Sequence, residues 1–116
     1  MFNCFDYTII TYDAQFLGLN LTKVLTFASS KGGAGKSTLC VNLSAYFATL
    51  GKQVMILDVD PQRSSYEWIT ESSESILSEV SAIHLTDESE IEAIIAETGC
   101  DLVCIDLQGV LDNSPL

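Results

Sequence analysis

The sequence predicts an α/β domain built on a mostly parallel sheet. Apolar runs at residues 24–28, 54–57 and 102–105 are typical of strands that a parallel sheet buries on both faces. Helical patterns separate these runs, and the alternation of strands with helices indicates this fold class. Glycines or aspartates follow the runs at their carboxyl ends, which is the edge where such sheets bind ligands.

Length and charge limit what the chain can be. The 116 residues provide for one domain at most, and 47% hydrophobic residues are enough for a core. The formal net charge of −11 repels phosphate backbones at long range, and five lysines and arginines leave no basic patch for nucleic acid. No stretch has the pattern of a secretory leader or a membrane span. We therefore expect a cytoplasmic chain that does not engage a membrane.

The first half of the chain divides into an arm, a strand and a helix. Residues 1–22 form an arm of unclear role, either an added segment or an upstream start without functional meaning, in which residues 8–12 have the pattern of a short strand. Residues 23–116 are the expected folded unit. A helix is expected over residues 36–50, with Gly51 at its end. Its predicted apolar stripe consists of Leu39, Leu43, Phe47 and Leu50.

The second half continues the alternation. Capping-box spacing in Ser64–Glu67 predicts the start of a short helix, and residues 70–79 have the composition of a solvated loop or a frayed helix. The pattern of residues 80–85 predicts a strand. Asp87 with Glu90 favours the start of another helix, which Gly99 would end, and residues 108–116 are expected as loop.

Cysteine and histidine give no sign of a metal centre. The cysteines lack CxxC spacing and are better explained as buried thiols, at Cys4, Cys40, Cys100 and Cys104. His84 ends a predicted strand without a partner, and we expect it at the surface rather than in catalysis.

The stretch Ser29–Thr38 predicts a phosphate-binding loop between a strand and a helix. Its glycines let the backbone turn tightly and direct N–H groups at an anion, which would sit at a helix N-terminus. Lys36 would reach the β/γ oxygens and Ser37 would ligate Mg²⁺. Asp106 closes the last apolar run and would hold the same ion, through a water. The predicted nucleotide-binding residues of the loop are Lys31, Gly32, Gly33, Ala34, Gly35, Lys36, Ser37 and Thr38.

The loop departs from the usual P-loop pattern, because Ser30 stands where the first glycine is expected and a second lysine, Lys31, precedes Gly32. This arrangement resembles the deviant Walker A motif of the ParA/MinD family of ATPases, which partition plasmids and chromosomes or position the division machinery. The resemblance covers Lys23 to about Gly109. It implies a three-layer P-loop NTPase-type fold that is incomplete at the C-terminus, so that the chain would be an N-terminal half.

The resemblance assigns roles to further residues. The strand followed by Asp58-Val59-Asp60-Pro61-Gln62 matches the family's second acidic motif, in which Asp60 would orient the attacking water and Asp58 would lie nearer the metal. Lys31 would cross a dimer interface to the partner's nucleotide. Gly109 would donate its N–H to the γ-phosphate, although Asp106-Leu107-Gln108-Gly109 lacks the proline that is common at this switch.

The implied function is that of an ATPase of plasmid or chromosome partition, which forms a homodimer around two ATP molecules and responds to a ParB-like centromere-binding protein. Full-length members bind DNA nonspecifically, but we do not expect this of the acidic chain alone. The alternative is a non-catalytic remnant that binds nucleotide weakly or associates with a full-length relative. A MinD-like role is less favoured because it uses a C-terminal amphipathic membrane helix.

The resemblance also predicts an unpaired strand. Because later strands continue the family's sheet beyond the P-loop strand, we expect residues 24–28 to form an exposed apolar edge. Exposed edges of this kind invite self-association. The chain alone is therefore expected to be poorly soluble and to have little ATPase activity.

Overall fold

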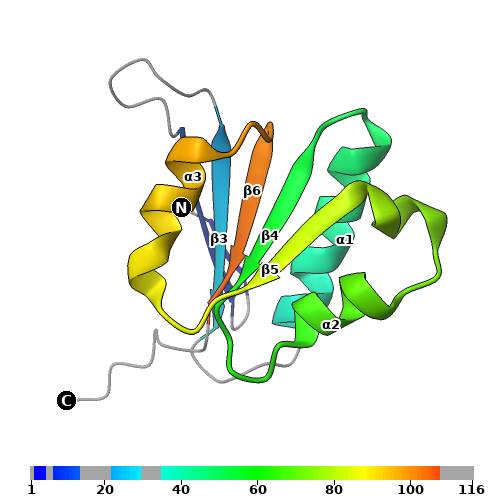
Figure 1. The fold of residues 1–116 in the computed structure, drawn as a ribbon. Helices are drawn as coiled ribbons and strands as arrows, with labels where there is room; N and C mark the ends of the chain where they lie inside the picture. The colour runs from blue at the N-terminus through cyan, green and yellow to red at the C-terminus, as the bar shows by residue number, and fades with distance from the viewer. Residues whose placement is uncertain (1, 5–6, 14–21, 30–34, 108–116) are drawn as a thin grey trace.

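A computed structural model describes residues 2–4, 7–13, 22–29 and 35–107 (Figure 1). In this part of the chain one sheet has the strand order β1-β2-β3-β6-β4-β5. The last four strands of that order run parallel, while β1 and β2 are antiparallel to their neighbours. The predicted α/β fold with a mostly parallel sheet is confirmed.

From β3 onward strands and helices alternate along the chain as predicted. The strands are β1 (Phe2–Cys4), β2 (Tyr7–Asp13), β3 (Lys23–Ser29), β4 (Val54–Asp58), β5 (Val80–His84) and β6 (Leu102–Asp106). The α-helices are α1 (Lys36–Thr49), α2 (Ser64–Glu71) and α3 (Ile91–Glu97), and the short 3₁₀ helices are η2 (Ser75–Glu79) and η3 (Glu88–Glu90).

The helices cover both faces of the sheet and give three layers (Figure 1). Successive strand residues point to opposite faces, so β6 sends Leu102 and Cys104 to one side and Val103 to the other. The first side packs against α1, α2 and η2, and the second packs against Ile95 of α3. Because both faces are covered, β6 is buried along its whole length.

The expected apolar stripe of α1 is confirmed at Leu39, Leu43 and Phe47, which pack against the core, and is wrong at Leu50. The buried residues of the helix include the small side chains of Cys40, Ser44 and Ala48, whereas Leu50 is 55% exposed. Leu39, Leu43 and Phe47 lie beside this row, partly buried against the same core. Small residues let the helix axis approach the sheet closely, and the larger side chains then fill the flank. Gly51 follows the helix with φ of +84°, as its predicted role at the end requires.

α2 starts at Ser64, where a short helix was predicted, but its predicted cap is wrong. The residue before the helix is Arg63, with a left-handed φ of 58° and no side-chain cap, so the Ser64–Glu67 capping box does not form. Beyond Glu71 the expected loop contains the 3₁₀ helix η2. The predicted start of the next helix is confirmed, because Asp87 accepts a hydrogen bond from Ser89 N and opens η3 ahead of α3.

The exposed edge predicted for the P-loop strand is absent from the described structure, and that prediction is wrong. β2 pairs with β3 over its full length, from Tyr7 opposite Ser29 to Asp13 opposite Lys23. β6 pairs with the other side of β3. The segment expected as an arm of unclear role thus supplies a strand, and the P-loop strand has a neighbour on each side.

Deleting residues 1–13 should make the protein self-associate, because it uncovers the apolar β3 edge. Sedimentation velocity at several concentrations measures this. The control is deletion of residues 1–4, which removes β1 and leaves β2 on β3. Equal behaviour of the two deletions would contradict a shielding role for β2.

Candidate functional site

The carboxyl ends of three neighbouring strands meet at the start of α1. In the sheet register Asp106 of β6 lies opposite Phe27 of β3 on one side and Asp58 of β4 on the other. The chain after β3 leads to α1, whose first residue is Lys36. The parallel sheet therefore brings together residues that are far apart in the sequence, as predicted for this edge.

Lys36 is the centre of this cluster. Its side chain is 1% exposed, and its Nζ lies 3.0 Å from Asp60 Oδ2 and 2.7 Å from Asp106 Oδ1. It also donates a hydrogen bond to the Leu107 carbonyl oxygen. An ammonium group has three N–H donors; Asp60 Oδ2 and the Leu107 carbonyl each accept a hydrogen bond, and Asp106 Oδ1 is held as an ion pair.

The surroundings of Lys36 keep it charged. Burial by itself lowers the pKa of the ammonium, but the contacts and charges of Asp106 and Asp60 outweigh burial and raise the pKa above its usual value. Lys36 is therefore protonated at neutral pH, and its charge faces two carboxylates.

Asp106 contacts both of the first two residues of α1, Lys36 and Ser37. Its Oδ2 accepts a hydrogen bond from Ser37 Oγ at 2.9 Å, and its Oδ1 faces Lys36. The side chain is fully buried, and Oδ1 has no aligned hydrogen-bond donor among the described residues. Asp106 thus has coordinating capacity left at this atom.

The first turn of α1 has the geometry of an anion site. Gly35 precedes the helix with φ of 86°, a left-handed conformation that favours glycine, and it offers no side-chain cap. The first N–H groups of a helix have no partner within it, and they attract anions. Thr38 is exposed on this turn. Lys31, Gly32, Gly33, Ala34 and Gly109 lie outside the described residues.

The two aspartates after β4 have different environments. Asp60 is 17% exposed and faces Lys36, and its Oδ1 accepts a hydrogen bond from Gln62 N at 2.9 Å. Asp58 is fully buried and accepts hydrogen bonds from Asp60 N, Ser65 Oγ and Tyr66 N, at 3.0, 2.9 and 2.8 Å.

Three neighbours of the acidic motif were missed by the sequence analysis. Ser65 and Tyr66 contact Asp58, and the expectation that His84 lacks a partner is wrong. His84 Nε2 lies 3.3 Å from the Asp60 carbonyl oxygen, and its ring centroid lies 6.1 Å from that of Tyr66. His84 arrives there because β5 pairs with β4 and places it opposite Asp58. The position of His84 could therefore be found only from the pairing of β5 with β4, and no local sequence pattern indicates it.

The thiols are mostly remote from solvent. Cys40 and Cys104 are buried as predicted, whereas Cys100 is half-exposed and the side chain of Cys4 lies outside the description. Burial raises the pKa of the Cys40 thiol well above its usual value, so this thiol stays neutral. Among the described residues, no group of three or more His, Cys, Asp or Glu side chains is placed to hold a metal ion.

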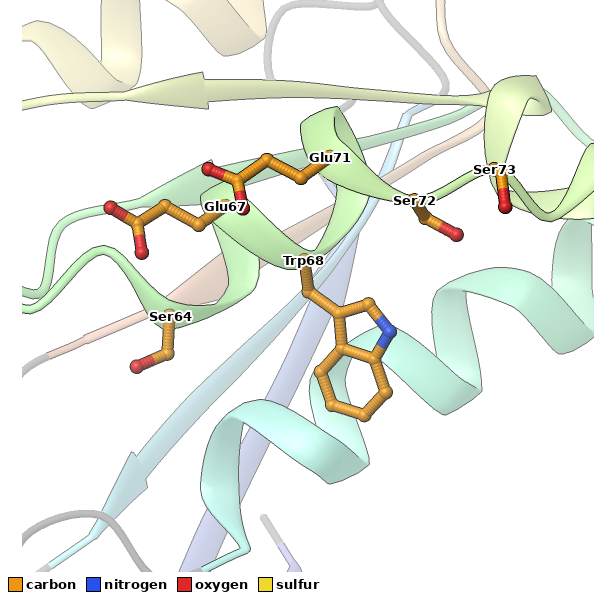
Figure 2. A pocket seen from close by; sticks show the side chains of 6 residues that line it. All are labelled: Ser64, Glu67, Trp68, Glu71, Ser72 and Ser73. Atoms are coloured by element: carbon orange, nitrogen blue, oxygen red, sulfur yellow. The ribbon is translucent and has the colours of Figure 1, made fainter.

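A separate open groove of about 450 Å³ lies along α2 (Figure 2). Figure 2 shows the Glu67 and Glu71 carboxylates directed away from the Trp68 ring, all three on the same helix. Carboxylates repel phosphates, so this groove does not suit a nucleotide.

Within the described residues, none of the helices has the length and hydropathy of a membrane span.

Comparison with known proteins identifies relatives. Residues 22–108 match a family model described as an AAA domain. The chain is 39% identical over 89 residues to Protein ParA of Rhizobium radiobacter, an alignment that covers 75% of the chain and 39% of the relative. It is 35% identical over 71 residues to the chromosome-partitioning ATPase Soj of Thermus thermophilus, covering 61% of the chain and 26% of that protein.

A third relative is the sporulation initiation inhibitor protein Soj of Bacillus subtilis, 34% identical over 76 residues, which are 66% of the chain and 30% of the relative. The matches thus span about a quarter to two fifths of the length of these curated relatives. The family match covers most of the chain and includes every strand end of the site. The chain belongs to the ParA-like family of P-loop ATPases.

Proposed function

We propose that this chain binds ATP with Mg²⁺ as part of a DNA-partition ATPase. The observation that carries the proposal is the buried Lys36 at the start of α1, held between carboxylates from two strand ends. Families of this fold bind nucleotides, and phosphate at a helix N-terminus gains from the helix dipole and the free N–H groups. Lys36 would exchange its protein acceptors for β/γ-phosphate oxygens.

Ser37 and Asp106 are the residues that would hold Mg²⁺. Magnesium beside phosphates is bound through one or two carboxylates and keeps several waters, so a site of three carboxylates is unnecessary. The fit is supported by Asp106 Oδ1, which is buried without an aligned donor, and by Ser37 Oγ, 2.9 Å from Oδ2. The ion would supply positive charge that offsets the phosphates.

Asp60 would orient the water that attacks the γ-phosphate. Phosphoryl transfer to water depends on positioning and charge neutralisation, with little covalent work by the protein. The Asp60 carboxylate is 3.0 Å from the ammonium that would contact the same phosphates, and it is the partly exposed partner of that pair. It can therefore leave Lys36 and face a water while Asp106 stays in place.

The remaining roles extend the family resemblance. Lys31 would contact the nucleotide of a second protomer in an ATP-bound homodimer, and Gly109 would donate its N–H to the γ-phosphate. The relative from Thermus thermophilus, named a chromosome-partitioning ATPase, supports a role in DNA segregation, and the family resemblance adds a ParB-like partner. With a net charge of −11, nonspecific DNA binding is not expected of this chain by itself.

Lys36→Ala should weaken Mg²⁺·ATP binding, because it removes the charge directed at the phosphates. A charge-assisted hydrogen bond contributes about 1.5–3 kcal/mol, or roughly ten- to hundredfold in Kd. Calorimetric titration measures this, and thermal unfolding checks that the variant is folded. The control is Lys52→Ala, which removes an exposed lysine. Equal affinity in the folded Lys36→Ala variant and the parent would contradict the proposed site.

Asp60→Ala should tighten Mg²⁺·ATP binding severalfold and, in a chain extended by the C-terminal half of a family member, should slow hydrolysis. The reason is that Asp60 competes with phosphate for the Lys36 ammonium but is needed to orient water. Binding titrations and phosphate release measure the two effects separately. Glu92→Ala, which removes an exposed charge on α3, is the control for a general change in electrostatic repulsion. Loss of binding as severe as in Lys36→Ala would contradict the division of roles.

A further inference from the structure

Asp58 of the acidic motif is buried. Unlike Asp60 and Asp106, it has no ion pair with Lys36 among the described residues. Its two oxygens accept three hydrogen bonds, from Asp60 N, Ser65 Oγ and Tyr66 N. Asp58 and Ser65 are both fully buried. A buried carboxylate needs such donors, because it would otherwise be strongly destabilised. One donor, Asp60, lies in the loop after β4, and the other two lie in the first turn of α2.

The contacts of Asp58 replace a missing helix cap. Arg63 precedes α2 and offers no side-chain cap, and its φ of 58° is a conformation that costs energy for a residue with a side chain. Asp58 accepts the hydrogen bond from the Tyr66 amide in the first turn of α2. It thereby fixes the start of α2 to the end of β4.

The same carboxylate fixes the loop residue that faces Lys36. Asp58 Oδ1 accepts the Asp60 backbone N–H at 3.0 Å, and the Asp60 carbonyl accepts the Arg63 N–H at 2.9 Å. The Asp60 side chain then points to Lys36 at 3.0 Å. The orientation of Asp60 therefore depends on Asp58, and Asp58 is held by Ser65.

We propose that Asp58 and Ser65 form a buried clamp that positions the Asp60 carboxylate, and that Asp58 is a positioning residue rather than a ligand of Mg²⁺. This differs from the role that the family resemblance assigns to Asp58. The inference rests on the proposed role of Asp60, but the clamp itself exists without nucleotide. Ser65 acts through Asp58 and touches neither phosphate nor metal.

Adjacent serines provide a matched test. Ser65 is buried on Asp58, whereas Ser64 is exposed beside the α2 groove (Figure 2). Amide hydrogen exchange of the nucleotide-free chain should be faster at Asp60 and Tyr66 in Ser65→Ala, by on the order of tenfold, while Val103 in β6 is unchanged. Ser64→Ala should leave all three amides unchanged, and Ser65→Thr should restore protection. Asp60 is the decisive amide, because it donates its hydrogen bond to Asp58 and makes none to Ser65.

Whether Asp58 is a ligand of Mg²⁺ is tested by measuring ATP binding at increasing Mg²⁺ concentrations. The Mg²⁺ concentration at half-saturation should be the same in the parent, Ser65→Ala and Asp58→Asn. A tenfold rise in that concentration in Asp58→Asn alone would place Asp58 on the ion and overturn the proposal. Unchanged exchange of the Asp60 amide in Ser65→Ala would overturn it too. If the parent binds no nucleotide, the proposed function fails, and the exchange experiment still decides whether the clamp exists.

Discussion

The Lys36 ammonium joins three parts of the sheet edge that the chain itself keeps far apart. It contacts Asp60 after β4, Asp106 at the end of β6 and the Leu107 carbonyl. A buried ammonium is unfavourable unless it is paired, and removing Lys36 would leave the buried Asp106 carboxylate without its counter-charge. Two carboxylates against one ammonium leave the cluster negative, which explains why a phosphate ligand would require a divalent cation with it.

The rest of the fold holds these groups in place. Parallel pairing of β4 with β6 sets Asp58 opposite Asp106, and β5 brings His84 to the same edge. β2 covers the outer side of β3, so the P-loop strand lies inside the sheet. The described chain thus keeps its site on interior strands, with β1 and β5 as the outermost strands of the described sheet.

Strands β3, β4, β5 and β6 and helix α1 could be predicted because their signals are local: apolar runs, a glycine-rich loop and Gly51 at the end of α1. The buried row of α1 was not predicted because the sheet selects small residues such as Ser44, which a search for large apolar residues overlooks. The meeting of Lys36 and Asp106 at one sheet edge followed from the predicted strands, but their direct ion pair was not predicted. The contact of Asp58 with Ser65 and the place of His84 could not be predicted, because they depend on strand pairing and on a loop with Arg63 at positive φ.

The most direct test of this account is a crystal structure of the chain with Mg²⁺ and a non-hydrolysable ATP analogue. The account predicts Lys36 Nζ on β/γ-phosphate oxygens, with the Lys36–Asp60 ion pair broken and the hydrogen bond between Asp58 and Ser65 retained. A nucleotide bound elsewhere, or bound at α1 with the Lys36–Asp60 pair intact, would contradict the central claim that this ammonium passes from carboxylate to phosphate.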